Sequence, residues 1–549
     1  MEKIVQRLNE VIKIKSWWMG IGLLAFWVMP SFAQNPFLPL WEYIPDTEPY
    51  VFEDPDNPGK YRVYIYGSHD SLKDAYCGRE QVLWSASVDS LDNWRYEGVI
   101  FTSIFDAKGN WLNASGEGDI LYAPDIVEKT GKDGKKTYYF YPNNQGVGRE
   151  GMVAKADRPD GPFHVCNWNP ENPTTCIGDL RFDPAVFIDE DGRVYGYWGF
   201  QESWGAELDP DDMASIKKGT QPVKNLIPNL NQDSVFNFFE ASSMRKIKDK
   251  YVLIYSRWTD KGEFGLSDSN YTLAYAYANN PLGPFTYGGT IIDGRGREQD
   301  CAGKTIATAT PGGNTHGSIV EINHQWYVFY HRQTGTNEFA RQAMVAPIKV
   351  EVEEGLNGKV FISEGEYTSE GFMLTGLDPK QKCEAGTACY YTGPTPASHS
   401  WPNFEYSGSY IQPTYHKRAK TVMAFDTVYN CPVVNNTDGS IIGYKYFNFD
   451  LMGSEDVSEA VFSLKPQGID ATIDILVGSP WLERGGIVLG KLKLTKEMPQ
   501  ERRDVCAQLS GFKGIKGKQP VYFVFSSAIK AHSVCDLYDF VLSAGKGRR

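Results

Sequence analysis

Five segments of the chain share one pattern: a polar residue, a short strand, a charged turn and then a strand rich in aromatic residues. The five polar residues lie 79, 58, 57 and 76 positions apart and are, in order, Asp46, Asp125, Asp183, Glu240 and His316. The aromatic strands are expected over 61–66, 138–141, 194–198, 251–255 and 326–330. A repeat of this length, with a hairpin in each unit, is typical of β-propeller blades. The first strand of each blade lines the axis, so we expect the five polar residues to converge there.

The rest of the chain favours an all-β protein with two domains. At 549 residues it is too long for one ordinary core, and aromatic residues make up 14% of it. A five-bladed propeller is predicted over residues 34–372. A second domain over 373–549 begins with a stretch rich in Gly, Thr and Pro. Its close-spaced strands, expected over 441–447, 471–477, 487–492 and 521–525, predict a β-sandwich.

The N-terminus has the pattern of a signal peptide over residues 1–33. Four basic residues precede an apolar run from Trp17 to Met29, and Ser31-Phe32-Ala33 offers a cleavage site. A retained anchor is the alternative, although the run is short for a membrane span. We expect export to the periplasm or the extracellular space, with no membrane span after cleavage. The net charge of −13 and the lack of a basic patch exclude nucleic acid as an expected partner.

Cysteine and histidine spacing gives no structural zinc site. The nine cysteines include no Cys-x-x-Cys, and the eight histidines show no His-x-x-x-His. Cys166 with Cys176, and Cys383 with Cys389, are close enough in sequence to form disulfides. The odd number leaves at least one thiol free or paired between chains.

Several carboxylates that meet at one axis supply the groups for glycoside hydrolysis. One carboxylic acid protonates the leaving oxygen, and one carboxylate deprotonates a water on the opposite face of the sugar. Asp46, Asp125 and Glu240 are the candidates. A third carboxylate nearby raises the pKa of the acid by repulsion. Three phenylalanines, Phe236, Phe238 and Phe239, precede Glu240, and desolvation by them also favours its protonated form.

The phrases around these residues, in their order, resemble glycoside hydrolase family 43. They are Ile44-Pro45-Asp46, Ala123-Pro124-Asp125, Phe239-Glu240-Ala241, His316-Gly317-Ser318 and Tyr330-His331-Arg332. The resemblance runs over about residues 39–350. It implies a five-bladed propeller with inverting chemistry on α-L-arabinofuranosyl and β-D-xylosyl linkages. The chain departs from the family pattern in two places: Thr47-Glu48 separate Asp46 from Pro49, and Ala241-Ser242 follow Glu240 in place of Gly-Pro.

The resemblance implies roles for individual residues. Asp46 would be the general base, with Glu48 as its rival, Asp125 the pKa modulator and orienter, and Glu240 the general acid. His316 would support a calcium ion, directly or through water, or else be a core histidine. Arg341 would reach the substrate or be a solvated strand-end charge, and His69 and Asp70 would form a rim turn with substrate contact. Asp183 is interpreted as a structural turn residue. No organic cofactor is implied.

The C-terminal part resembles carbohydrate-binding module family 6, in the phrases over 438–444, 485–490 and 535–540. Lys445-Tyr446-Phe447 replaces the usual Gly-Asp-Trp, and Trp481 is either a loop aromatic or a packing residue. A structural cap on the propeller is the alternative to a binding module.

The sequence therefore predicts an exported, inverting exo-glycosidase that removes arabinofuranosyl or xylosyl units from plant polysaccharide. Two alternatives stay open at this point: a galactan-directed exo-glycosidase of the same family, and a glycan-binding propeller without catalysis. A retaining fructan hydrolase would need a Trp-x-Asn-Asp-Pro-like phrase, which the N-terminal region lacks.

Overall fold

The computed structural model describes residues 34–72, 74–229, 231–233, 235–414, 431–453 and 457–544. The predicted signal segment over 1–33 lies outside these residues, so its cleavage stays a prediction. Within the described ranges, no helix is long and apolar enough to cross a membrane.

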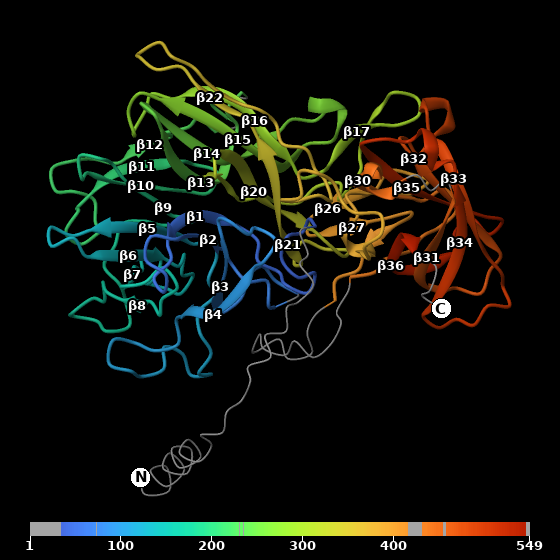
Figure 1. Ribbon diagram of the computed structural model, residues 1–549. Coiled ribbons are helices and arrows are strands. Elements are labelled where there is room, and N and C mark those ends of the chain that lie inside the picture. The colour runs from blue at the N-terminus through green and yellow to red at the C-terminus, as the bar shows by residue number, and fades with distance from the viewer. Residues whose placement is uncertain are drawn as a thin grey trace, which may run out of the picture. The chain divides into compact units, whose positions relative to one another are not determined.

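Four antiparallel sheets of four strands each follow one another along the chain (Figure 1). The first blade holds β1 (Glu48–Glu53), β2 (Tyr61–Tyr66), β3 (Glu80–Ser87) and β4 (Arg95–Thr102). The second holds β5 (Asp125–Thr130), β6 (Lys136–Tyr141), β7 (Ala154–Ala156) and β8 (His164–Val165). The third holds β9 (Ala185–Ile188), β10 (Val194–Trp198), β11 (Trp204–Leu208) and β12 (Val223–Lys224). The fourth holds β13 (Phe238–Ile247), β14 (Lys250–Thr259), β15 (Ser269–Ala278) and β16 (Thr286–Asp293).

The fifth blade closes the ring. It holds β19 (Ser318–Ile322), β20 (Gln325–Gln333) and β21 (Arg341–Ile348). β9 contacts both β5 and β13, β1 contacts β19, and Thr47 forms a parallel bridge with Gly317 that joins the first blade to the fifth. Two small hairpins lie alongside, β17 (Arg297–Gln299) with β18 (Thr305–Ala307) and β22 (Val350–Val352) with β23 (Val360–Ile362). The predicted five-bladed propeller is confirmed.

The aromatic second strands form the interior between blades. Tyr64 and Tyr66 of β2 are fully buried, and their rings pack towards Phe52 and Phe140 of the first and second blades. Large flat side chains on alternating positions fill the wedge between neighbouring twisted sheets. The five predicted aromatic strands are β2, β6, β10, β14 and β20.

The C-terminal part forms one large sheet that curls over in a sandwich-like manner. Its order is β25-β30-β35-β32-β33-β34-β31-β36-β29-β28, with β24 (Cys383–Glu384) also paired to β36. The strands are β25 (Tyr390–Thr392), β28 (Tyr410–Ile411), β29 (Val433–Val434), β30 (Ile441–Asn448), β31 (Val457–Pro466), β32 (Ala471–Val477), β33 (Ile487–Leu494), β34 (Arg503–Ser510), β35 (Lys518–Ser527) and β36 (Cys535–Ala544). Phe462, Phe523 and Phe540 pack as a ring cluster inside the curl. All four strands predicted here are present.

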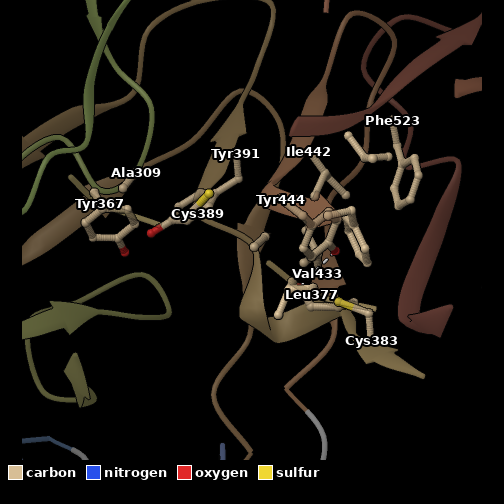
Figure 2. Packing of buried hydrophobic residues seen from close by; sticks show 14 of the residues in the cluster. Ala309, Tyr367, Leu377, Cys383, Cys389, Tyr391, Val433, Ile442, Tyr444 and Phe523 are labelled. Atoms are coloured by element: carbon tan, nitrogen blue, oxygen red, sulfur yellow. Dashed lines mark hydrogen bonds between the residues drawn. The ribbon is translucent and has the colours of Figure 1, made fainter. Parts of the chain in front are cut away.

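The largest core cluster crosses the predicted domain boundary near residue 372. It joins Tyr330 and Tyr367 of the propeller side to Tyr391 and Ile442 of the C-terminal side, and Figure 2 shows Tyr367 and Tyr391 near each other. The fully buried Arg332 donates from Nη1 to the carbonyl of Ala388 at 3.0 Å. The boundary stays a prediction, but the two parts share one interior.

The two disulfides considered from the sequence are not formed. Cys166, Cys176, Cys383 and Cys389 all lie among the described residues and are present as thiols. Cys383 and Cys389 are buried in the shared interior, where they pack as small apolar side chains.

Candidate active site

Strand register sorts the axial residues into layers. Asp46, Asp183 and His316 each stand two positions before the first residue of β1, β9 and β19. Glu240 lies inside β13, where the pairing to β14 is irregular on both sides of it. Asp46, Asp183 and Ala241 have positive φ values of 57°, 51° and 68°. Non-glycine residues rarely adopt this conformation, which concentrates backbone strain at this end of the axis.

Asp46 is a buried carboxylate surrounded by donors. Its Oδ2 accepts a hydrogen bond from the Ser68 hydroxyl, and its Oδ1 accepts one from Arg341 Nη1 at 3.0 Å. Burial alone would raise its pKa, but the nearby guanidinium of Arg341 and the hydrogen bond from Ser68 hold the pKa of Asp46 below its ordinary value. Asp46 is therefore ionised at neutral pH.

His331 holds the backbone of Asp46 in place. Its Nδ1 accepts from the backbone N–H of Asp46 at 3.2 Å, and its Nε2 lies 2.9 Å from the carbonyl oxygen of Asn314. This pattern requires the proton on Nε2. Burial lowers the pKa of His331 to about 3, so the ring is neutral.

Arg341 and Asp70 form a buried ion pair behind Asp46, and their predicted contact with substrate stays a prediction. The Arg341 side chain donates from Nε and Nη2 to the two oxygens of Asp70 at 2.9 and 2.8 Å. Both residues are 1% exposed. The third nitrogen, Nη1, donates to Asp46 at 3.0 Å, so all three nitrogens of the buried guanidinium have protein partners. Its place is that of a positioning residue for the carboxylate.

His69 is likewise a buried side chain with protein partners. Its Nε2 lies 3.2 Å from Glu42, and its Nδ1 lies 3.5 Å from Glu80. Although burial opposes the charge, the two carboxylates raise the pKa of His69 to about 10. This charged cluster ties the turn after β2 to Glu42 and Glu80, and the predicted sugar contact of His69 stays a prediction.

Glu240 differs from Asp46 because no donor satisfies it. It is 8% exposed, and within the described part of the chain no hydrogen bond reaches its carboxyl group. Burial and the negative charge of Asp46 raise its pKa to about 8, against the opposing charge of Arg341. Glu240 is therefore protonated at neutral pH.

Asp183 is the third carboxyl group of this layer. Its Oδ1 accepts from Asn143 Nδ2 at 2.8 Å, and its Oδ2 lies 3.8 Å from His316 Nδ1. Burial, followed by the charges of Glu240 and Asp46, raises the pKa of Asp183 well above its ordinary value. The sequence interpretation of Asp183 as a turn residue missed this placement. A feature of the sequence could have indicated it: Asp183, like Asp46 and His316, stands two residues before the start of its strand.

Asp125 lies two residues further along its blade's first strand than Asp46 and Asp183 do along theirs, and so deeper along the axis. It is the first residue of β5, and Glu48 holds the equivalent position in β1. Asp125 accepts from Tyr50 Oη at 2.9 Å and from the backbone N–H of Val186 at 2.6 Å. Burial and the charge of Glu48 raise its pKa to about 7. Its charge is not among those that act on Glu240, so its predicted role as modulator stays a prediction without a supporting contact.

Glu48, the rival base, belongs to the same deeper layer. It is 2% exposed, its carboxylate is paired with Arg245, and it accepts from Ser243 Oγ at 2.8 Å. Asp46 precedes β1 by two residues, whereas Glu48 is the first residue of that strand, so the two lie at different depths. The charge of Asp46, and not that of Glu48, is among those that act on Glu240, which favours Asp46 over Glu48 as the base.

An arc of aromatic rings borders the layer of Asp46, Asp183 and Glu240. Phe182 and Phe239 directly precede Asp183 and Glu240, and their neighbours extend the series. Successive ring centroids lie 5.8, 5.5, 5.1 and 5.4 Å apart along Tyr122, Phe182, Phe200, Phe239 and Trp258. Phe200 is 50% exposed. Exposed ring faces beside a protonated and an ionised carboxyl group suit a sugar substrate.

No metal centre is built by the side chains of the described ranges: no group of three or more His, Cys, Asp or Glu there has a metal-binding arrangement. His316 is a single imidazole beside Asp183. Calcium prefers six to eight oxygen ligands. A calcium ion at His316 would take most of its ligands from water, and the protein alone does not make a fitting site.

Comparisons with known proteins agree on one family. A family model described as glycosyl hydrolases family 43 matches residues 55–354, a stretch that begins after Asp46 and includes Asp183, Glu240 and Arg341. The chain is 32% identical over 525 residues to a xylosidase/arabinosidase from Thermoclostridium stercorarium, which covers 91% of this chain and 98% of that protein. It is 28% identical over 337 residues to xylosidase/arabinosidase 43A from Humicola insolens, covering 53% of this chain and 88% of that one.

One solved structure is similar over nearly the whole chain. It is a family 43 arabinoxylan arabinofuranohydrolase from Bacillus subtilis in complex with cellotetraose. The sequence identity is 20% and the TM-score 0.44, with 93% of this chain and 97% of that chain covered.

Proposed function

The chain belongs to glycosyl hydrolases family 43 and is a glycoside hydrolase, and from this premise we propose that it is an exported, inverting exo-glycosidase that releases α-L-arabinofuranosyl or β-D-xylosyl units from plant polysaccharide. The observation that carries the proposal is the contrast between two buried carboxyl groups: Asp46 accepts hydrogen bonds from Ser68 and Arg341, whereas Glu240 has no donor among the described residues. The names of its relatives, two of them xylosidase/arabinosidases, support the choice of pentosyl units.

In the proposed reaction, Glu240 donates its proton to the glycosidic oxygen as the bond to the anomeric carbon breaks. A water on the other face of the sugar loses a proton to Asp46, and its oxygen bonds to the anomeric carbon. Glu240 ends ionised and Asp46 protonated, so one proton transfer through solvent restores the enzyme. Attack from the face opposite the leaving group inverts the configuration.

We assign to Asp183, in place of Asp125, the third carboxyl role. The charge of Glu240 acts on the pKa of Asp183, so these two buried carboxyl groups titrate as a pair. Once one of them is ionised, its charge opposes the ionisation of the other and keeps a proton in the pair. Asp125 is instead assigned to hold the first, second and third blades together through Tyr50 and Val186.

The stereochemistry is testable on the first product formed. With an aryl xyloside or arabinofuranoside, proton NMR should show the anomer of inverted configuration before mutarotation sets in. A panel of aryl glycosides that includes galactosides identifies the sugar in the same experiment. First-formed product of retained configuration would contradict the assignment of Asp46 as base, and turnover of the galactoside alone would favour the galactan-directed alternative.

The role of Arg341 predicts a shift in the acidic limb of the pH profile. The positive charge lowers the pKa of Asp46, which must be ionised for catalysis. Arg341→Met removes that charge, so the pKa of Asp46 should rise and the acidic limb of kcat/KM should move to higher pH. Arg341→Lys keeps a charge and should move the limb less. A limb that stays in place in Arg341→Met, with the fold intact by thermal unfolding, would contradict the positioning role.

The C-terminal sheet is proposed as a structural support rather than a sugar-binding module. The core of this sheet is continuous with that of the propeller. Arg332 of the propeller donates a hydrogen bond to the backbone carbonyl of Ala388, on the C-terminal side. Export and any calcium requirement remain part of the proposal, and no step of the reaction above depends on a metal ion.

A further inference from the structure

A hairpin from the C-terminal side docks on the catalytic end of the propeller. It consists of β26 (Ser398–Ser400) and β27 (Asn403–Glu405), joined by Trp401 and Pro402. It lies against residues 336–338, which follow β20 of the fifth blade. Asn403 bridges Asn337, and the backbone N–H of Glu338 donates to the carbonyl of Pro402 at 3.0 Å.

Strand pairing shows that this is the end that holds Asp46 and His316. Ser318, two residues after His316, pairs with Phe329 near the end of β20, so the connection after β20 leaves from that end. Glu48 pairs with Tyr66 at the end of β2 in the same way. The described residues of the connection after β2 (67–72 and 74–79) and the connection over 334–340 therefore lie at the end of the axis that holds Asp46 and His316, and the hairpin contacts both connections.

Buried polar contacts fix the hairpin there. His399 Nε2 lies 2.5 Å from Glu338 Oε1, and the other oxygen of Glu338 accepts from the Tyr76 hydroxyl. Glu338 is 2% exposed, and its charge acts on Glu240. A Cβ at Gly312 would lie 2.5 Å from His399 Nδ1, so the hairpin packs directly on the chain that leads to His316.

Trp401 is held at one edge and open on its faces. Its indole Nε1 donates to Tyr76 Oη at 3.3 Å, and the ring of Tyr76 lies 5.0 Å from the guanidinium of Arg341, which binds Asp46. Yet the residue is 71% exposed. The Trp401 ring is thus fixed by its polar edge while its faces stay open to solvent. Only Tyr76 and Arg341 separate it from Asp46, so it is placed to meet substrate.

We propose that Trp401 forms the platform for the sugar on the leaving-group side of the scissile bond, so that the C-terminal part completes the catalytic site. The inference rests on the proposed function. Asp46, His331 and Arg341 are buried, with Asp46 5% exposed, so the released terminal sugar is placed against the Asp46 carboxylate. The remainder of the glycan then extends towards Tyr76, where the Trp401 ring stands.

The experiment compares oligosaccharides, which are long enough to reach the Trp401 ring, with a free pentose, which is not. Trp401→Ala is assayed on xylo-oligosaccharides with and without arabinofuranosyl branches, and free xylose and free arabinose are tested as inhibitors. We expect KM for the oligosaccharides to rise roughly three- to tenfold, the loss of one aromatic contact, while the inhibition constant of the free pentose stays unchanged. Phe361→Ala, which removes a 55% exposed ring of β23, is the matched control and should change neither.

Two further variants separate recognition from folding. Trp401→Phe keeps a flat ring and should restore most of the affinity, whereas Trp401→Leu keeps apolar bulk without a ring face and should behave as Trp401→Ala. Unchanged KM in Trp401→Leu would overturn the inference while leaving the proposed function in place. A parallel rise in the inhibition constant of the pentose would also overturn it, because the ring would then belong to the inner sugar site. A wild-type protein without activity on any pentoside would refute the proposed function itself.

Discussion

Glu240→Gln is expected to lower kcat/KM on a xylosyl or arabinofuranosyl oligosaccharide by about 10²- to 10⁴-fold. Glutamine has the shape of the protonated acid but holds no transferable proton. The loss should be much smaller on a dinitrophenyl glycoside, whose leaving group departs without protonation. The measurement is the ratio of the two losses, taken in the same buffer.

The matched control is Glu384→Gln. Glu384 is also 8% exposed, and burial raises its pKa to about 7, but it lies in β24 of the C-terminal sheet. This variant should keep full activity on both substrates. If Glu240→Gln lost the same factor on both leaving groups, Glu240 would be acting on the sugar or on Asp46 and not as the acid.

The propeller was predictable because its signals are local. The aromatic second strands and the polar residue before each first strand repeat in every blade, and each element follows from a few neighbouring residues. The hairpin of Trp401 gave no such signal. Its placement depends on the pairing of Asn403 with Asn337 and on the ion pair of His399 with Glu338, contacts between segments more than 60 residues apart in the chain.

The sequence indicates which strand starts face the axis but not how deep each acid lies along it. The charge of Asp46 acts on Glu240. Asp125 is the first residue of its strand, whereas Asp183 precedes its strand by two residues, and the sequence interpretation did not favour Asp183. Side chains two apart in a strand point the same way, so only their depth along the axis distinguishes them. The burial of the charged residues could not be predicted from the sequence either. Arg341 and His69 are charged residues near strand ends, and their enclosure by Asp70, Glu42 and Glu80 depends on the packing of loops.

Asp183→Asn is expected to move the alkaline limb of kcat/KM to lower pH. That limb reports the loss of the proton that Glu240 must donate, and the pKa of Glu240 is raised to about 8 in the intact site. The charge of Glu240 acts on Asp183, so the two titrate as a pair and the last proton leaves against the charge of the carboxylate that is already ionised. An asparagine side chain carries no charge, so in this variant the proton of Glu240 is lost at lower pH. The profile is measured on a substrate with a poor leaving group, where proton donation limits the rate.

Asp125→Asn is the comparison that tests the register argument. Asparagine can still accept from the backbone N–H of Val186, and Tyr50 can reverse its role and accept from the new amide, so the fold should survive. Because the charge of Asp125 does not act on Glu240, the alkaline limb should stay in place. If Asp125→Asn moved the limb and Asp183→Asn did not, the modulator would be the deeper carboxylate, as the resemblance first implied. If the alkaline limb stayed in place in both variants, burial and the charge of Asp46 would account for the raised pKa of Glu240.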